Sequence, residues 1–298
     1  MTAAPRRRLL LAALLLLAAA APASSAEGLR VVFEPARPRG GDVVLVRVRG
    51  VTPTATVEAA VDGHPLGTFR LADGHGALFG VDMDASTGPR PWRVTATIDG
   101  RVVTVQGRLP VAARAYRVQR LTVARGMVEL DPDTERRANE ETARLRAIYR
   151  TASGERLWQE AFVRPVAGDE PGMGFGARRV INGHPRAPHS GIDFAAPVGA
   201  TVVAANRGRV ALSAEFFFPG RLVILDHGLG LHTAYFHLDT IAVREGQLVA
   251  RGEPLGTVGM TGRVTGPHLH FGAQVGTARI DPAALLGLAL REGAGGAN

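Results

Sequence analysis

Short runs of alternating apolar and polar residues fill the first part of the chain. In DVVLVRVRG (residues 42–50), three valines fall on one face, because successive side chains of a strand point to opposite faces. The pairs Asp62-Gly63 and Asp99-Gly100 separate such runs and are strong signals of two-residue hairpin turns. We therefore predict a small antiparallel β-sandwich over residues 27–113.

A different periodicity follows in LDPDTERRANEETARLRAIYR, residues 130–150. Asp131 suits the N-cap of a helix and Pro132 its first position, and acidic residues fill the first turn. A narrow apolar stripe recurs at helical spacing, so one side of this helix should lie against another domain. We predict a linker over residues 114–173 that carries this helix.

Strand patterns return from residue 174 and continue to residue 286, separated by glycine-rich turns. The candidate strands lie within 201–216, 221–238, 246–259 and 267–275. Residues 287–298 are predicted to form a tail. The predicted fold is therefore mainly β: a β-sandwich, a short helical linker and an antiparallel sheet domain over 174–286.

The amino terminus predicts export. Three arginines precede a leucine- and alanine-rich run, and small residues follow, with Ser24 and Ala26 at the positions that suit cleavage after Ala26. The apolar run is short for a membrane span. We therefore predict that residues 1–26 are a cleaved signal peptide, that no span remains, and that the mature protein lies in the periplasm or cell envelope.

The amino-acid composition limits which metal ligands and which partners are possible. The chain has no cysteine, so a disulfide or a thiolate metal site is excluded, and any metal must be held by His, Asp or Glu. The formal net charge is +8, but no basic run is interleaved with aromatic residues. We therefore predict no nucleic-acid partner.

Histidines cluster late in the chain, where seven of the nine fall between residues 184 and 270. In GPHLHF (266–271), strand alternation places His268 and His270 on one face and Leu269 in the opposite layer. Two imidazoles on one face suit a shared metal, a substrate contact or neither. The pattern alone does not choose between these alternatives.

His189 and Asp193 are two further candidate metal ligands. Their spacing of four aligns side chains on a helix or a strand, and Pro188 and Gly191 favour an extended chain. Together with His270 they offer two imidazoles and a carboxylate, the kind of three-ligand set that catalytic zinc sites use with water in the fourth position. The stretch LHTAYFHL adds Tyr235 and His237 on one face of another predicted strand.

The stretches GHPRAPHSGIDFAAPVGATVVA, YFHL and TGPHLHFGAQV, in this order, resemble the lysostaphin-type (LytM-type) zinc peptidoglycan endopeptidases. The resemblance covers roughly 174–283. It implies that His189, Asp193 and His270 hold Zn²⁺ and that His237 and His268 flank the metal-bound water as catalytic residues. It also implies a β-fold with a groove across the sheet.

The same resemblance implies a substrate, the peptide cross-links of bacterial cell-wall peptidoglycan. The bond is left open between D-alanyl-diaminopimelate and glycine bridges, and an exported chain with a β-rich amino-terminal domain favours the first. The alternative is a non-catalytic regulator of another wall hydrolase. Since such relatives lack key residues and this chain keeps all five, the enzyme is favoured; transient contact with cell-wall machinery fits either role.

Several neighbouring residues are further candidates for the groove or for structural roles. Tyr235 and Asn182 are candidates for substrate binding, with a packed strand aromatic as the alternative for Tyr235. His184 is a further candidate for the groove, whereas His227 and His232 are interpreted as structural. The linker over 114–173 is a candidate for blocking the groove.

Overall fold

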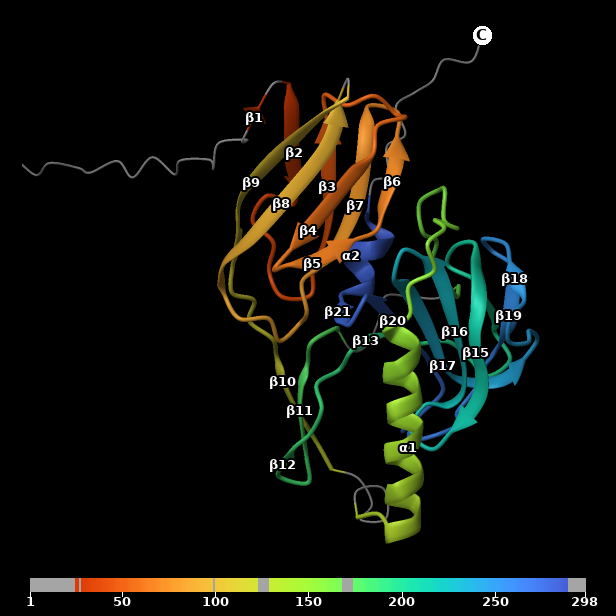
Figure 1. The fold of residues 1–298 in the computed structure, drawn as a ribbon. Helices are drawn as coiled ribbons and strands as arrows, with labels where there is room; N and C mark the ends of the chain where they lie inside the picture. The colour runs from red at the N-terminus through yellow and green to blue at the C-terminus, as the bar shows by residue number, and fades with distance from the viewer. Residues whose placement is uncertain (1–24, 27, 99, 123–128, 168–173, 289–298) are drawn as a thin grey trace, which may run out of the picture.

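The computed structural model describes residues 25–26, 28–98, 100–122, 129–167 and 174–288, and in these the chain is mostly β (Figure 1). No helix in these ranges is both long and apolar enough to cross a membrane. The predicted signal peptide lies outside the described residues except for Ser25–Ala26, which form the short strand β1. The mainly β prediction is confirmed.

Two sheets form the amino-terminal sandwich. One sheet has the order β1-β2-β3-β7-β6, and the other has the order β5-β4-β8-β9. Apolar side chains from both sheets share one core, which includes Trp92. The strand bounds are β2 Leu29–Glu34, β3 Val43–Arg49, β4 Val57–Val61, β5 His64–Leu66, β6 Thr68–Leu71, β7 Gly74–Gly80, β8 Gly88–Ile98 and β9 Arg101–Val111.

The hairpin signals of the sequence correspond to observed turns. Val61 pairs with His64, and the two residues between them, Asp62 and Gly63, have φ values of 52° and 78°. Positive φ at both central positions is the conformation that Asp-Gly pairs adopt in tight hairpins. Ile98 pairs with Arg101 at the second signal.

The carboxy-terminal domain is built on a sheet with the order β13-β20-β17-β16-β15-β18, extended by β14, β19 and β21. All its pairings are antiparallel. The helix α2 (Pro282–Leu286) follows β21. The bounds are β13 Gly191–Phe194, β14 Thr201–Val203, β15 Gly208–Phe216, β16 Gly220–Gly228, β17 Leu231–Ile241, β18 Leu248–Val249, β19 Pro254–Val258, β20 Leu269–Val275 and β21 Ala278–Ile280.

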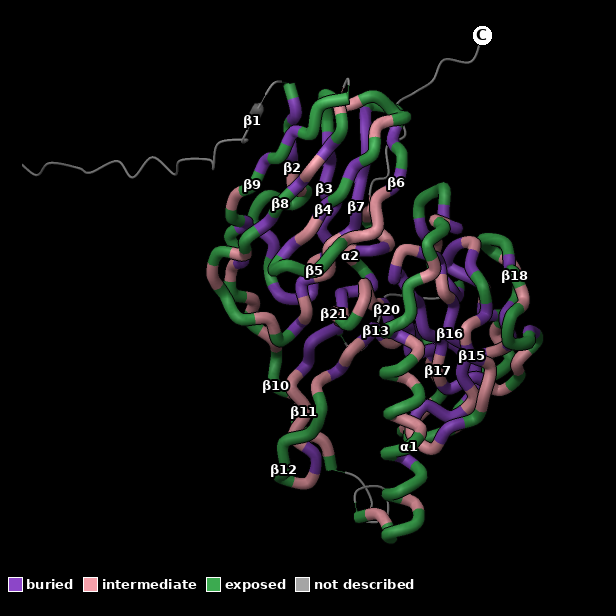
Figure 2. The backbone as a smooth tube through the Cα atoms, in the orientation of Figure 1, coloured by how far each residue is buried: buried purple, intermediate pink, exposed green. Residues whose placement is uncertain are grey.

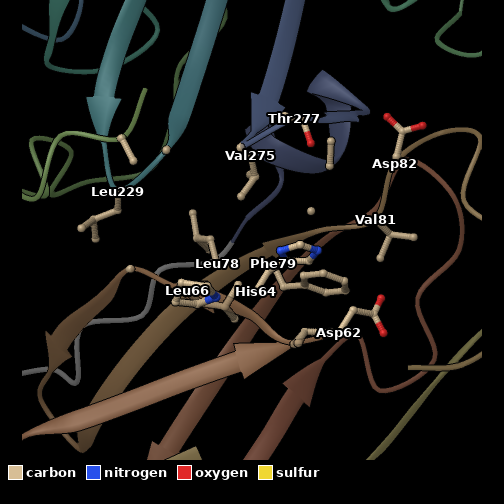
Figure 3. A pocket seen from close by; sticks show the side chains of 18 of the residues that line it. Asp62, His64, Leu66, Leu78, Phe79, Val81, Asp82, Leu229, Val275 and Thr277 are labelled. Atoms are coloured by element: carbon tan, nitrogen blue, oxygen red, sulfur yellow. The ribbon is translucent and has the colours of Figure 1, made fainter. Parts of the chain in front are cut away.

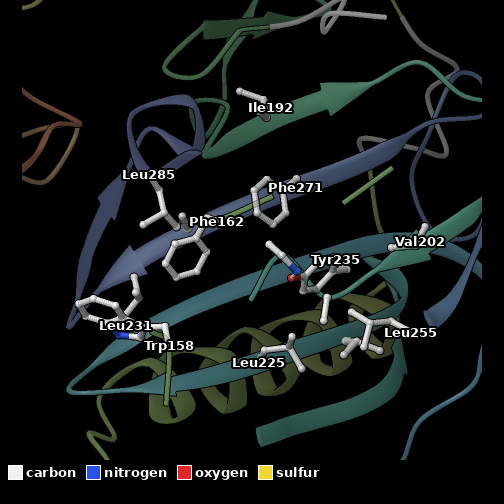
Figure 4. Packing of buried hydrophobic residues seen from close by; sticks show 14 of the residues in the cluster. Trp158, Phe162, Ile192, Val202, Leu225, Leu231, Tyr235, Leu255, Phe271 and Leu285 are labelled. Atoms are coloured by element: carbon white, nitrogen blue, oxygen red, sulfur yellow. Dashed lines mark hydrogen bonds between the residues drawn. The ribbon is translucent and has the colours of Figure 1, made fainter. Parts of the chain in front are cut away.

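One face of this sheet carries the main core (Figure 4). Tyr235 of β17 and Phe271 of β20 lie side by side on this face, with ring centroids 5.4 Å apart. Buried residues predominate along β16 and β17 of this sheet (Figure 2). Trp158 and Phe162 pack into the main core, and Trp158 is fully buried. Part of the predicted linker therefore contributes core side chains to the carboxy-terminal domain.

The opposite face of the sheet is covered partly by α1 (Pro132–Tyr149). The Asp131 side chain accepts hydrogen bonds from the backbone N–H groups of Asp133 and Thr134, both at 3.0 Å, as its N-cap position predicts. Tyr149 packs against apolar side chains of β15, β16 and β17. The predicted contact of the helix with another domain is confirmed.

A third, small sheet joins the linker to the start of the carboxy-terminal domain. β10 (Val118–Leu121) pairs in parallel with β11 (Arg178–Ile181), and β11 pairs with β12 (His184–Pro185). Gln119 is the register partner of Arg179 in this ladder. The linker strand thus lies beside the segment that leads into the histidine-rich region.

A charged contact joins the sandwich to the sheet domain. The Arg279 side chain on β21 donates to Asp82 at 3.0 and 2.7 Å and to Asp84 at 2.8 Å. The backbone N–H of Arg279 also donates to Asp82. Burial raises the pKa of Asp82, but the hydrogen bonds from Arg279 outweigh it and hold that pKa below its ordinary value.

Arg279→Gln should lower the free energy of unfolding by about 1 kcal/mol at pH 7, since solvent screens side chains that are 30% and 29% exposed. The lowered folded-state pKa of Asp82 means that this contribution is complete above the ordinary aspartate pKa. It is lost as pH falls through the lowered value. Urea denaturation at neutral and acidic pH measures the difference, which should shrink below about pH 4.

Arg136→Gln serves as the control, because its pair with Asp133 is 66% and 83% exposed. That variant should match wild type at both pH values. Equal losses in the two variants would contradict a specific role of Arg279 at the domain contact.

Candidate metal centre

Three side chains from different parts of the chain converge on one point. His189 Nε2 lies 2.9 Å from Asp193 Oδ1 and 2.9 Å from His270 Nδ1, and the last two atoms are 2.8 Å apart. The histidine side chains are buried or nearly so, and the carboxylate is 15% exposed. These are the residues that the sequence and its resemblance assigned to a metal.

The pairing of β13 with β20 brings the ligand candidates together. Asp193 and His270 are direct register partners, so their side chains emerge on the same face. Gly191 permits the close approach: a Cβ atom there would lie 2.4 Å from the Phe271 carbonyl oxygen and 2.7 Å from His270 Nε2. His189 precedes the strand, and its backbone is held by hydrogen bonds to Gly176 and Ala177.

The donor set fits a cation. His189 Nδ1 donates to the Gly174 carbonyl oxygen at 3.3 Å, which leaves Nε2 of the neutral ring with a lone pair. That lone pair faces a carboxylate oxygen and a second imidazole nitrogen. A metal ion in the centre would satisfy all three, and two imidazoles with one carboxylate are ligands that zinc commonly takes.

Electrostatics at the cluster agrees with this interpretation. Burial raises the pKa of the Asp193 carboxyl group. The hydrogen bonds with His189 and His270 lower this pKa by more, so that it lies well below its ordinary value. Burial lowers the pKa of His270, which keeps its imidazole neutral near neutral pH. An ionised carboxylate and neutral imidazoles are the protonation states that metal binding requires.

His237 enters the same groove through a bulge in β17. Tyr235 pairs with Val223, but Leu238 pairs with Arg221, so β17 has one extra residue between these partners. His237 has a φ of 65°, unusual for a residue other than glycine, and the bulge turns its side chain toward the groove. Phe236, its neighbour, stacks on the His270 ring at 5.2 Å between centroids.

The protonation of His237 is fixed by its surroundings. Its Nδ1 donates to the Thr261 carbonyl oxygen at 2.9 Å, which leaves Nε2 as the acceptor. Burial, with His270 and His268 close by, lowers the pKa of His237 to about 3. The ring is therefore a neutral base near pH 7.

His268, the residue before β20, lines the same groove. Its Nδ1 donates to the Gly266 carbonyl oxygen at 2.8 Å, and its Nε2 lies 3.9 Å from Asp193 Oδ1. The His237 and His268 rings are 4.8 Å apart between centroids. Leu269 between the two histidines is fully buried on the other face.

The expectation that Tyr235 shares a face with His237 is wrong. The bulge breaks the alternation after Tyr235, so this side chain points into the main core and is fully buried. Its hydroxyl accepts hydrogen bonds from the Ala205 N–H at 2.8 Å and from Thr233 at 3.0 Å. Tyr235 therefore cannot contact a substrate in the groove.

The structure also places the other candidates. Asn182, in the turn between β11 and β12, and His184 in β12 are not among the described residues that line the groove, so their assignment to it is not supported. His227 and His232 are fully buried away from the metal cluster. His227 bonds Arg207 and Thr233, in agreement with a structural role.

The groove that holds the cluster has a volume of about 280 Å³. Its walls include residues that sequence reasoning missed: Gln119, Arg179, Phe236 and Arg263. No local pattern identifies them, because β10, β11, β17 and the loop before β20 meet only in the folded chain. Gln119 also shows that the predicted linker forms part of the groove wall.

A larger cavity of about 660 Å³ lies between the two domains (Figure 3). His64 and Phe79 approach it from the sandwich, and Leu229 and Val275 approach it from the sheet domain. Among the described residues, the cluster that could hold a metal lies in the smaller groove and not here. The smaller groove is therefore the candidate active site.

Comparison with known proteins agrees with this geometry. Residues 187–282, about a third of the chain, match the model of Peptidase family M23. Peptidoglycan DD-endopeptidase ShyB of Vibrio cholerae is 43% identical over 94 residues, which are 32% of this chain and 22% of ShyB. ShyC of the same organism is 40% identical over 119 residues, 39% of this chain and 27% of ShyC. The matched segments thus span about a quarter or less of these relatives.

A solved structure resembles more of the chain. It is a Pseudomonas aeruginosa protein assigned provisionally to peptidase M23, with a TM-score of 0.60 and 28% identity. The match covers 84% of this chain and 96% of that one. The combination of amino-terminal and sheet domains therefore recurs in a protein of similar extent.

Zinc should stabilise the protein through the three-residue cluster. At about a hundredfold excess over Kd, binding adds roughly 2.7 kcal/mol, which corresponds to a rise in Tm of about 5–10 °C. We expect this rise for the wild-type protein and for His64→Ala, an exposed histidine outside the cluster. Asp193→Asn should show none in differential scanning fluorimetry; an equal rise would place the metal elsewhere.

Tyr235→Phe distinguishes packing from catalysis. The variant leaves the buried Ala205 N–H without its acceptor, so the free energy of unfolding should fall by about 1–3 kcal/mol. Zinc content and hydrolysis below the unfolding temperature should stay at wild-type levels. If the variant lost hydrolysis but kept its stability, Tyr235 would have a role in the site beyond packing.

Proposed function

We propose that this chain, whose residues 187–282 match the model of Peptidase family M23, is a zinc-dependent endopeptidase that hydrolyses peptide cross-links of bacterial peptidoglycan. One observation carries the proposal. His189, Asp193 and His270 converge on a single point, and two further histidines, His237 and His268, line the same groove. This combination suits hydrolysis of a peptide bond by a metal-activated water.

His189, Asp193 and His270 would hold Zn²⁺ through Nε2, Oδ1 and Nδ1. Bound zinc supplies Lewis acidity to a carbonyl oxygen and lowers the pKa of water. The protein contributes a fixed ligand set, since each member is held by strand pairing or a backbone hydrogen bond. A site fixed before the substrate arrives needs little rearrangement during the reaction.

His237 and His268 would handle the protons and the developing negative charge. In each ring a backbone carbonyl fixes the proton on Nδ1, so each Nε2 faces the reaction as an acceptor. After accepting a proton from water, the same nitrogen becomes a donor to the oxyanion or to the leaving amine. The low pKa of His237 favours rapid release of that proton, and His268, 20% exposed, lies nearer to solvent.

The substrate assignment rests on the relatives and on the groove. The Vibrio cholerae relatives are named peptidoglycan DD-endopeptidases, which favours a D-alanyl bond over a glycine bridge. A cell-wall substrate places the protein outside the cytoplasm, in agreement with the predicted signal peptide over residues 1–26. The mature chain would then work in the periplasm or cell envelope.

Digestion of cross-linked wall peptides tests this proposal. Wild-type protein should contain about one zinc and split dimeric muropeptides, with the products identified by mass spectrometry. His268→Ala and His237→Ala should keep the zinc, because neither residue is a ligand, but lose at least a hundredfold in kcat/KM. Chelation should abolish cleavage, and zinc should restore it.

His184→Ala is the matched control, since this histidine is exposed and outside the groove lining. It should cleave at the wild-type rate. A wild-type protein that binds zinc but cuts nothing would favour the regulator of another wall hydrolase. A protein that binds no zinc would overturn both the metal centre and the enzyme.

A further inference from the structure

Two polar side chains that line the groove each have a buried atom without a hydrogen-bond partner in the described structure. Gln119 of β10 and Arg179 of β11 are register partners in the parallel ladder, and both line the groove that holds the metal cluster. Gln119 Oε1 and Arg179 Nε are buried, and neither has a hydrogen-bond partner among the described residues. Buried polar atoms in folded proteins are normally bonded, so two adjacent exceptions need an explanation.

Positive charge accumulates at the same place. Arg263 lines the groove with Arg179, and its guanidinium lies 4.1 Å from the centroid of the Phe218 ring. Burial lowers the pKa of Arg263, and the charges of Arg179 and Arg186 lower it further. Positive charges gathered in a partly buried groove favour the binding of an anion there.

The carboxylate of the metal cluster is not the anion that this charge favours. Burial lowers the pKa of Arg179, and the Asp193 charge opposes this effect. However, Asp193 Oδ1 faces the two imidazoles and is assigned to the metal. No ion pair forms between Arg179 and an acidic side chain in the described part of the chain, so its charge is available to a ligand.

We propose that Arg179, with Gln119 beside it and Arg263 in the same groove, binds a carboxylate of the wall peptide close to the scissile bond. A guanidinium presents a planar fork of N–H groups that matches a carboxylate with two parallel hydrogen bonds. The Gln119 side chain would accept from an amide of the same substrate. The amino-terminal linker thus supplies part of the substrate site.

This inference rests on the proposed function and makes it more specific. Diaminopimelate carries a free carboxylate on the carbon that bears the amide nitrogen of the cross-link, whereas a glycine bridge has no charge beside its peptide bonds. The groove should therefore prefer a cross-link with that carboxylate over its amidated form. The metal cluster alone gives no such preference.

The test compares two substrates that differ in one group. Dimeric muropeptides with a free or an amidated diaminopimelate carboxylate are digested by wild-type full-length protein, and kcat/KM is measured for each. Wild type should prefer the free carboxylate by roughly ten- to hundredfold, the range expected for a charge-assisted contact. In Arg179→Gln the ratio should fall to near one.

Arg186→Gln is the matched control for general electrostatic attraction. Arg186 is exposed and its charge acts on Arg263, but it is not among the residues that line the groove. Its preference ratio should therefore stay close to that of wild type. A similar fall of the ratio in both variants would overturn a local contact at Arg179.

A binding measurement separates this inference from the endopeptidase itself. The zinc-loaded His268→Ala protein is titrated by calorimetry with D-alanyl-diaminopimelate in its free and amidated forms, with and without Arg179→Gln. Preferential binding of the free form that requires Arg179 supports the inference even if wild type cleaves nothing. Cleavage by wild type with equal binding and equal kcat/KM for both forms overturns it and leaves the endopeptidase intact.

Discussion

The antiparallel pairing of β13 with β20 is the constraint on which the candidate site depends. It places Asp193 directly opposite His270, and their side chains converge only because the two backbones come close at Gly191. A larger residue at 191 would push against the Phe271 carbonyl oxygen and the His270 ring, and the donor atoms would separate. The geometry of the metal centre therefore depends on the strand register as well as on the identity of the ligands.

A second irregularity extends the site to the neighbouring strand. The bulge in β17 lets Tyr235 anchor the core while Phe236 and His237 both turn toward the groove. Phe236 packs against the apolar cluster under α1 and also stacks on His270. The helix, the sheet and the candidate metal ligand are thus connected through one aromatic side chain, so packing on this face supports the position of the imidazole.

The sandwich and the linker contribute more than a separate domain. Trp158 and Phe162 complete the core of the sheet domain, β10 forms part of the groove wall, and Arg279 bonds Asp82 across the domain contact. These contacts tie the sandwich and the linker to the sheet domain. The match to the Pseudomonas aeruginosa structure likewise extends well beyond the family segment.

The sequence by itself determined the mainly β fold, the hairpin turns and the capped helix, which depend on alternation, turn chemistry and short-range spacing. It also predicted two histidines and an aspartate as a ligand set, from their spacing and the family resemblance, but their convergence depends on the pairing of β13 with β20. Only the tertiary structure decided that Tyr235 belongs to the core and that Gln119, Arg179 and Arg263 line the groove. A bulge shifts the alternation without a reliable local signal, and a groove wall is assembled from strands distant in sequence, so neither could be predicted from residue patterns alone.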